Sequence, residues 1–469
     1  MVGLSGGIFV IYVKFSRMLV RLLVQNLFSF GELTEFNMLP GRSNRLSNHV
    51  LKAGNLELLK LNAIYGANGA GKSKLIQALE LLKNFVITGT MPVGFITETF
   101  KFVEDSRLQD VYLGVEFIKN NIPFFYGLTI NQGIIIEEEL LISGLDKKED
   151  IILFKRTDNV AQEALDVYFH DDILSNAEAA LFPAFLKNEL LQRNQPILFY
   201  MKNRQSPVFN SYRIAAEWFE RDLVIILPNS KQSTTGLLFS SKIIFDFAVE
   251  TMRSFNTGID NLDVETIPAE EYFGQDDKRL IDVFTSQLKA TSRRWKIIDE
   301  NRIDSVFTIE NDKPVVKKVI FYHKEDEGKI KFELSQESDG TKRLFDYIPV
   351  LFSLLYFDTV FFIDEIERSI HPLLIKELIK KFSLDPKTKG QLIFSTHESN
   401  LLDQELFRPD EIWFAEKNKQ GATELFPLSE FKEHHTIDIR KGYLTGRYGA
   451  IPFLSNLKDL NWDKYAETN

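Results

Sequence analysis

Apolar and polar positions divide the chain into stretches with a strand-like or a helix-like period. Continuous or alternating apolar runs, typical of strands, occupy residues 19–30, 56–64, 111–117, 124–130 and 134–142. Asn-containing turns separate the last three runs, which predicts an antiparallel meander. Between residues 74 and 85 the apolar positions follow a helical period. A helix is therefore expected just after the second apolar run.

The spacing of apolar residues changes near residue 160. Residues 161–300 are mainly helical in pattern, most clearly at 177–193, 211–219, 242–255 and 278–291. No heptad persists over several turns, so we expect no long coiled coil. Strand patterns return at 307–321 and 329–334, and helix and strand then alternate to about residue 403. The remaining tail predicts a hairpin and terminal helices.

The loop between the apolar run and the helix at 74–85 is rich in glycine. Strand, glycine-rich turn, Lys-Ser and helix together are typical of a P-loop, which binds phosphates. Glycines let successive N–H groups converge on phosphate oxygens, and the helix start adds positive potential. We expect Lys72 to contact the β- and γ-phosphates and Ser73 to bind Mg²⁺. The predicted nucleotide-binding residues are Gly66, Asn68, Gly69, Ala70, Gly71, Lys72 and Ser73.

A second apolar strand, residues 359–363, ends in Asp364 and Glu365. Strands that end in solvated acids are common, but downstream of a P-loop this is a Walker B pattern. We expect Asp364 to share the Mg²⁺ ion with Ser73, directly or through water. Glu365 would polarise the attacking water as general base.

Two more segments carry candidate phosphate contacts. Ser338 and Gly340 begin a predicted helix, where a helix N-terminus would bind an anion; an ordinary N-cap is the alternative. The P-loop already holds the phosphates of its own nucleotide, so we infer that these two residues act across a dimer. His397 follows the buried strand 391–395, where a neutral imidazole would hydrogen-bond the γ-phosphate.

The order of these motifs resembles that of ABC-type ATPases, including the SMC and RecF branch. More narrowly, residues 364–372, 395–397 and 446–452 resemble stand-alone bacterial AAA-type, RloA-like ATPases, whose relatives act in anti-phage defence. The resemblance implies ATP held between two subunits, with Ser338 and Gly340 meeting the nucleotide on Lys72 of the partner subunit. It also implies that Ser369 lies in the D-loop at the dimer seam and that His397 is the switch histidine.

The chain departs from this pattern in three respects. The signature stretch keeps only Ser338 and Gly340 of the Leu-Ser-Gly-Gly-Gln sequence of transporters. No Q-loop glutamine can be assigned, although Gln109 and Gln132 are candidates without a motif. The adenine-stacking residue is also unplaced, so ATP rather than GTP as substrate follows from the resemblance.

The resulting fold class is α/β: an ABC-ATPase-like P-loop head, with a mixed sheet and an antiparallel β subdomain, that carries an inserted helical subdomain. The predicted divisions are an N-terminal extension at 1–17, the N-terminal half of the nucleotide domain at 18–160, a helical insertion at 161–300, the C-terminal half at 301–410, and a tail at 411–469. The tail is too short for an additional nuclease domain.

Composition narrows the classes of function. The absence of cysteine excludes disulfides and Cys-ligated zinc and suits a cytoplasmic protein. The net charge of −10 argues against a general nucleic-acid binder. The basic spots at 293–296 and 342–343 are expected to be solvated helix faces, and no membrane span is expected. His434 and His435 beside Glu433 suggest a metal site, but a solvated helix start accounts for them better.

Three functions stay open at this point. The first is a defence ATPase that forms a dimer or larger assembly and controls a separate toxic effector, such as a nuclease. The second is a RecF- or SMC-like ATPase of DNA repair or chromosome handling, with nucleic acid as partner. The third is the ATPase subunit of an ABC transporter, which needs a membrane partner. We rank them in this order.

Overall fold

The computed structural model describes residues 16–450, apart from 44, 55, 146–147, 160–161, 163, 231–233, 256, 275–276, 291–294, 299–304, 326–327 and 432–436. Within this part, no helix is both long enough and apolar enough to cross a bilayer. The predicted extension at 1–17 falls almost wholly outside the described residues.

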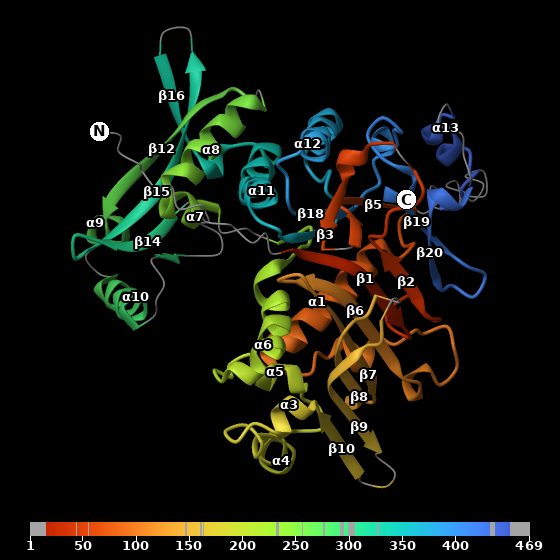
Figure 1. Ribbon diagram of the computed structural model, residues 1–469. Coiled ribbons are helices and arrows are strands. Elements are labelled where there is room, and N and C mark those ends of the chain that lie inside the picture. The colour runs from red at the N-terminus through yellow and green to blue at the C-terminus, as the bar shows by residue number, and fades with distance from the viewer. Residues whose placement is uncertain are drawn as a thin grey trace, which may run out of the picture.

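A six-stranded sheet forms the centre of the molecule (Figure 1). Its order is β11 (Leu223–Ile226), β17 (Val360–Ile363), β18 (Gln391–Ser395), β5 (Leu61–Tyr65), β19 (Ile412–Lys417) and β20 (Thr423–Pro427). The first five strands are parallel, and β20 pairs antiparallel with β19. Every residue of β5, β17 and β18 is buried, as expected for parallel strands covered on both faces.

Alternate residues of this sheet enter two different cores. Ile64, Phe362 and Ile393 pack with helix α1 (Lys72–Thr88) and the antiparallel sheet. Their sequence neighbours, such as Ala63 and Ile363, pack with helices α11 (Asp339–Tyr356) and α12 (Pro372–Leu384). The carboxyl ends of the parallel strands therefore open at one edge between the two helical layers, where ligands of α/β proteins bind.

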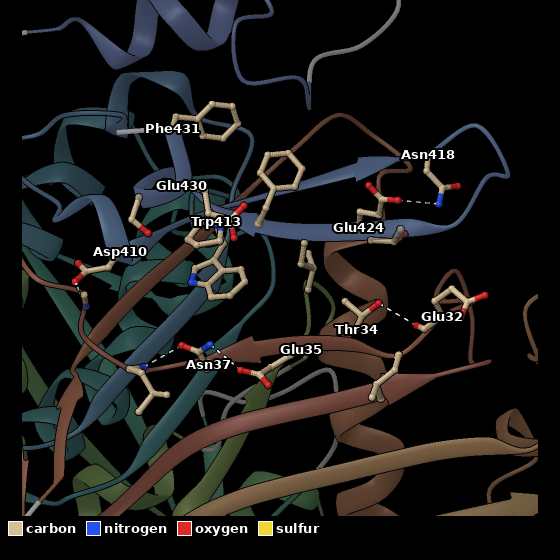
Figure 2. Close-up of a pocket in the computed structure, with 18 of the residues that line it drawn as sticks. Glu32, Thr34, Glu35, Asn37, Asp410, Trp413, Asn418, Glu424, Glu430 and Phe431 are labelled. Carbon is tan, nitrogen blue, oxygen red and sulfur yellow. Dashed lines mark hydrogen bonds between the residues drawn. The ribbon is translucent and has the colours of Figure 1, made fainter. Parts of the chain in front are cut away.

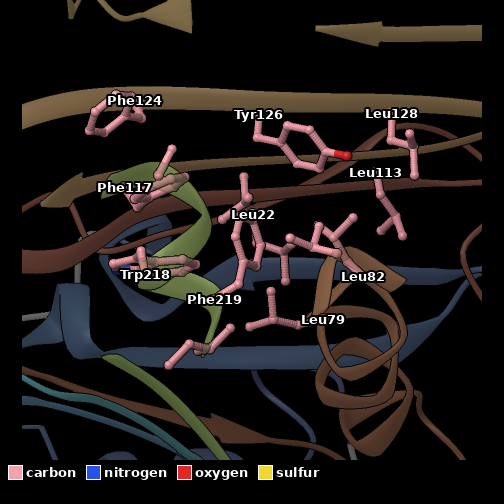
Figure 3. Close-up of a cluster of buried hydrophobic side chains, with 14 of the residues drawn as sticks. Leu22, Leu79, Leu82, Leu113, Phe117, Phe124, Tyr126, Leu128, Trp218 and Phe219 are labelled. Atoms are coloured by element: carbon pink, nitrogen blue, oxygen red, sulfur yellow. The ribbon is translucent and has the colours of Figure 1, made fainter. Parts of the chain in front are cut away.

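A seven-stranded antiparallel sheet covers the α1 side. Its order is β10 (Ala164–Phe169), β9 (Ile151–Asn159), β8 (Ile134–Ile142), β7 (Ile122–Asn131), β6 (Val111–Lys119), β1 (Arg17–Gln25) and β2 (Thr34–Asn37). Leu22, Leu113 and Phe117 of this sheet face Leu79 and Leu82 of α1. Trp218 and Phe219 fill the remaining space, and Trp218 stacks on Phe117 with ring centroids 4.3 Å apart (Figure 3).

A second lobe projects from the α11 side (Figure 1). Its sheet joins β12 (Ile259–Pro268), β15 (Lys313–Glu325), β14 (Ser305–Glu310) and β13 (Trp295–Ile297), and β16 (Gly328–Glu333) pairs with β15. The lobe shares a core with α11 through Leu262 and Phe321, so it is packed onto the nucleotide domain.

The other elements are shorter or lie at the periphery. They are β3 (Val50–Ala53), β4 (Leu56–Leu59), α2 (Gly94–Thr97), α3 (Asp171–Leu174), α4 (Phe182–Phe185), α5 (Ile197–Met201), α6 (Asn210–Glu217), α7 (Thr234–Ser240), α8 (Lys242–Ser254), α9 (Ala269–Phe273), α10 (Lys278–Ala290) and α13 (Ile439–Leu444). Two π-helical turns, Leu186–Leu190 and Trp218–Asp222, extend α4 and α6.

The predicted α/β class, with a P-loop head and an antiparallel β subdomain, is confirmed. The meander forms β6, β7 and β8, the C-terminal hairpin forms β19 and β20, and α6, α8 and α10 lie where helical spacing predicted them. The predicted strand 19–30 ends at Gln25, and the run 56–64 breaks at Lys60 into β4 and β5.

The description of residues 161–300 as a helical insertion needs correction. The segment contains strands β10, β11, β12 and β13, and β11 belongs to the central sheet itself. The run Leu223–Ile226 has four apolar residues, too few to distinguish a buried strand from part of a helix by period. Where the domains divide stays a prediction.

Candidate nucleotide-binding site

The predicted P-loop connects the end of β5 to the start of α1. Gly69 and Gly71 have φ angles of 80° and 113°, which side chains rarely tolerate. A Cβ atom on Gly71 would collide with the hydroxyls of Thr423 and Ser29. Thr423 Oγ1 donates to the Ala70 carbonyl at 2.7 Å, so β20 supports the loop from behind.

Lys72 begins α1 and is buried, with 4% of its surface exposed. Its Nζ donates to the carbonyls of Gly66 at 2.7 Å and Ala67 at 3.1 Å. Burial lowers the pKa of Lys72 to about 8, although nearby carboxylates, chiefly that of Asp364, oppose the shift. The ammonium group thus lies inside the loop, within reach of any group that displaces these carbonyls.

Asp364 and Ser73 meet at the carboxyl edge of the central sheet. Ser73 Oγ donates to Asp364 Oδ1 at 3.0 Å, and the Ser395 hydroxyl donates to the same oxygen. Glu365 N donates to Ser395 Oγ at 2.9 Å, and Asp364 N donates to the carbonyl of Ile226. The three strands β11, β17 and β18 therefore fix the Asp364 carboxylate, which is 2% exposed.

This oxygen set fits a magnesium ion. A hydroxyl and a carboxylate are the hard ligands that Mg²⁺ prefers, and the ion usually takes its remaining ligands from phosphates and water. In the described residues no three His, Cys, Asp or Glu side chains are grouped as a metal site. Phosphate oxygens of a bound nucleotide would complete the coordination of an ion at Ser73 and Asp364.

Glu365 and His397 share one pocket with the P-loop. The pocket has a volume of about 730 Å³, and its lining includes Gly66, Asn68, Glu365, Glu367, Arg368 and His397. His397 Nδ1 lies 3.3 Å from Lys72 Nζ, and His397 N donates to Glu367 Oε1 at 2.7 Å. Burial, and then the charge of Lys72, lower the pKa of His397, so the ring is neutral near pH 7.

The signature residues lie elsewhere on the chain. Ser338 caps α11 by accepting from Thr341 N at 3.2 Å, which is the N-cap geometry that the sequence left open as an alternative. A Cβ on Gly340 would lie 2.7 Å from the Ser369 carbonyl, so the signature turn packs tightly on the predicted D-loop. Neither Ser338, Gly340 nor Ser369 lines the pocket beside the P-loop.

Several residues of the site were given no role from the sequence. Ser395 contacts Asp364, and Glu367 contacts His397. Both lie in segments that resemble RloA-like ATPases, but serine and glutamate are common residue types, and neither marks a site by itself. Ile226 at the end of β11 accepts from Asp364 N, and this contact was missed because β11 was not predicted. Phe28 lies beside the first turn of α1, with its ring centroid 4.6 Å from Lys74 Nζ.

The remaining candidates lie away from this pocket. Gln109 lines a different pocket and Gln132 sits in the β7–β8 turn, so neither lines the pocket beside the P-loop. Arg343 is buried against the Tyr347 ring, contrary to the expected solvated face. His434, His435 and Glu433 lie outside the described residues, as do positions 293–294.

The model of one protein family matches most of the chain. This family is described as "AAA domain, putative AbiEii toxin, Type IV TA system", and the match covers residues 61–403. These bounds enclose both the P-loop and the strand that precedes His397. No curated protein matches the chain.

Three of the solved structures to which the chain is similar are SMC heads. One, an SMC head bound to the C-winged helix domain of ScpA, has 12% identity and a TM-score of 0.40, over 88% of this chain and 99% of that chain. The SMC head domain from Thermotoga maritima has 13% identity and a TM-score of 0.33, over 87% and 98%. A head with an extended coiled coil, bound to the C-terminal domain of ScpA derived from Pyrococcus furiosus, has 12% identity and a TM-score of 0.38, over 89% and 100%.

Proposed function

The chain belongs to the AAA-domain family whose model matches residues 61–403, and from this premise we propose that it binds and hydrolyses ATP at a site completed by a second copy. The observation that carries the proposal is the hydrogen bond between Ser73 and Asp364, which are 291 positions apart. It joins the two motifs that a P-loop ATPase needs for metal and phosphate.

Lys72 is the proposed phosphate ligand. The γ-phosphate would replace the carbonyls of Gly66 and Ala67 as partners of the ammonium group, because a charge-assisted bond to phosphate is stronger than one to a neutral carbonyl. Ser73 and Asp364 would hold Mg²⁺, which neutralises phosphate charge. Glycines in the loop leave room for the phosphates to approach the backbone.

Glu365 is the proposed general base. Its backbone has φ of 50°, and it lines the pocket next to Gly66. A carboxylate there would accept a proton from the water that attacks the γ-phosphate. His397, neutral at pH 7 and 3.3 Å from Lys72 Nζ, would hydrogen-bond the same phosphate and orient it.

The proposed assembly is a nucleotide-dependent homodimer. Ser338 is exposed at the start of α11, and the positive end of a helix suits an anion. Ser338 is absent from the lining of the pocket beside its own P-loop. Ser338 and Gly340 would therefore meet ATP held by Lys72 of the partner subunit, with Ser369 at the seam.

We further propose that ATP-driven dimerisation controls a separate toxic effector, such as a nuclease, in bacterial anti-phage defence. The resemblance of residues 364–372 to RloA-like ATPases supports this, as does a family description that names a toxin and a toxin–antitoxin system. A DNA-handling role gains less support, because Arg343 is buried and Lys342 pairs with Asp339 at 3.6 Å.

Replacing Glu365 by Gln tests the proposed site. The amide keeps the shape but accepts no proton, so E365Q should bind ATP, hydrolyse it at least about 100-fold more slowly, and accumulate as an ATP-dependent dimer. Turnover and light scattering after gel filtration measure both effects. Glu178→Gln, an exposed glutamate far along the chain, is the control. Turnover of E365Q equal to that of the parent would contradict the assignment.

A further inference from the structure

A groove separate from the nucleotide pocket lies between β2 and the β19–β20 hairpin (Figure 2). Its volume is about 860 Å³, larger than that of the pocket beside the P-loop. The floor includes Trp413 and Phe426, and three apolar side chains at its margin are exposed: Leu33 by 55%, Leu39 by 40% and Phe431 by 37%. Neither the catalytic proposal nor the dimer proposal uses this surface.

Both strands that border the groove are edges of their sheets. Strand β2 ends the seven-stranded sheet and β20 ends the six-stranded sheet. Thr423 N points away from β19, since it donates to the Ser29 carbonyl at 2.7 Å. Backbone groups alternate along a strand, so the N–H and C=O of Leu425 point the same way. Within the described residues they have no backbone partner on that side, and such an edge can accept another strand.

The groove is also strongly acidic. Glu32, Glu35, Glu424 and Glu430 are exposed, and none has an ion-pair partner among the described residues. Among the residues that the structure describes, no Lys, Arg or His lines the groove. The fifth acid, Asp410, is different, because it is buried and paired with Arg408 at 2.7 Å. Four carboxylates that have no ion-pair partner in the described part of the chain surround an apolar floor, so the groove suits a ligand that is both basic and apolar.

The groove has a direct contact with the P-loop. Thr423 lines the groove through β20, and its hydroxyl is bonded to the Ala70 carbonyl at 2.7 Å and to Ser29 Oγ at 2.8 Å. A strand added to β20 would restrain Thr423, and through it the loop that holds the phosphates. Occupation of the groove and nucleotide binding would thus influence one another.

We propose that this groove binds an extended, basic segment of a partner protein, which pairs as a strand with the outer edge of β20 at Leu425 and alternates Lys or Arg with aliphatic residues. The proposal deepens the proposed control of an effector, since it names the surface through which a partner would reach the nucleotide site. The carboxylates select the basic side chains, the groove floor receives the aliphatic ones, and Leu425 supplies backbone bonds.

Synthetic peptides test the groove directly. The probe is a fluorescent nine-residue peptide that alternates Lys and Val, and its acidic twin has Glu in place of Lys. The full-length chain should bind the basic probe at least tenfold tighter than the twin at fixed ionic strength, as measured by anisotropy. Two further probes are versions of the basic peptide with N-methyl groups at alternate residues. In one version the methyl groups lie along one backbone edge of the extended peptide, and in the other they lie along the opposite edge. Only one of them should lose at least tenfold in affinity, since only one edge of the added strand faces β20.

Charge-reversal variants test whether the peptide binds at the groove. The double variant E424K/E430K should weaken binding of the basic probe at least tenfold. The matched control E149K/E178K makes the same charge change on exposed residues elsewhere and should stay within twofold. Thermal melting shows that each variant is folded. Binding should persist in the K72A variant, so failure of the ATPase proposal and failure of the groove proposal give different results.

Coupling is measured as the change in ATP affinity when the probe is present. We expect at least a threefold change in the parent and none in T423V, which keeps the shape of Thr423 without its hydroxyl.

Three results would overturn the proposal: equal affinity for the basic and acidic probes, equal loss in both charge-reversal variants, or no effect of either N-methylation. A peptide of residues 451–469, with two lysines and three acids, is the last probe. If the 451–469 peptide displaces the basic probe, the groove binds residues 451–469 of this chain and the partner proposal is wrong.

Discussion

Asp346 is a carboxyl group in the interior of α11, with 8% of its surface exposed. Its Oδ1 has no hydrogen-bond partner among the described residues, and burial raises the pKa of Asp346 to about 7 despite the charge of Arg343. In the unfolded chain the pKa would be near the ordinary value of about 3.9. Because the folded-state pKa is the higher one, the folded chain binds more protons between these values. The contribution of Asp346 to stability is therefore full at low pH and is lost as pH rises through 7.

Replacing Asp346 by Asn should remove this pH dependence. The neutral amide has no charge to desolvate, so D346N should be more stable than the parent by about 1–3 kcal/mol at pH 8, with the difference shrinking toward pH 4. Chemical denaturation at pH 4.5, 6 and 8 gives the free energies of unfolding. Asp282→Asn, on the exposed face of α10, is the control. A constant difference across this pH range would show that Asp346 is ionised in the folded chain.

Among the structural elements, the start of α11 packs against the predicted D-loop around Ser369. Gly340 lies against the Ser369 carbonyl, and Tyr347 OH donates to the Ile366 carbonyl at 3.0 Å. Glu365 and Ser369 have positive φ angles of 50° and 63°, so the segment between them has a tight, strained path. The signature turn therefore depends on the segment that follows Asp364.

Replacing Gly340 by Ala tests this packing. The added Cβ would lie 2.7 Å from the Ser369 carbonyl, so either the turn or the D-loop must shift. Overpacking of this kind costs about 1–3 kcal/mol. We expect G340A to lose at least tenfold in ATP turnover and to bind ATP as the parent does. Gly328→Ala in β16, where a Cβ meets nothing within 4 Å, is the matched control. Full turnover of G340A would remove the signature turn from the mechanism.

At the scale of the whole molecule, contacts of β15 connect the second lobe to the signature turn. His323 on β15 lies with its Nε2 2.6 Å from Glu337 Oε1, and Glu337 directly precedes Ser338. The lobe also shares a core with α11 through Phe321 and Phe345. Movement of the lobe would reach Ser338 by both routes, so it is suited to relay events outside the nucleotide pocket.

Mixing two inactive variants tests whether the site is completed by a second copy. In a K72A–S338A heterodimer, one site combines an intact Lys72 with an intact Ser338, and the other site has neither. Each variant alone should be inactive, whereas random pairing should restore about a quarter of the parent turnover. Mixing K72A with E365Q is the control: both act from the same chain, so no intact site forms. No recovery in the first mixture would contradict action across a dimer.

Local patterns were enough to find much of the site and of the fold. The glycine spacing before Lys72, the apolar strand before Asp364 and the alternation of β6, β7 and β8 depend on neighbours in sequence, so the chain itself predicts them. The roles assigned to Glu365 and His397 stay predictions, because geometry places them beside the P-loop without testing what they do.

Long-range contacts decided the rest. The central sheet contains β11 because Leu223–Ile226 pairs with the Walker B strand. A run of four apolar residues is too short to predict this pairing from the sequence. Thr423 supports Ala70 from 353 positions away, and no local pattern marks such a pair. The acidic groove exists only because two sheets end side by side. A sequence specifies local period and chemistry, but which strand becomes an edge depends on how distant segments share one core.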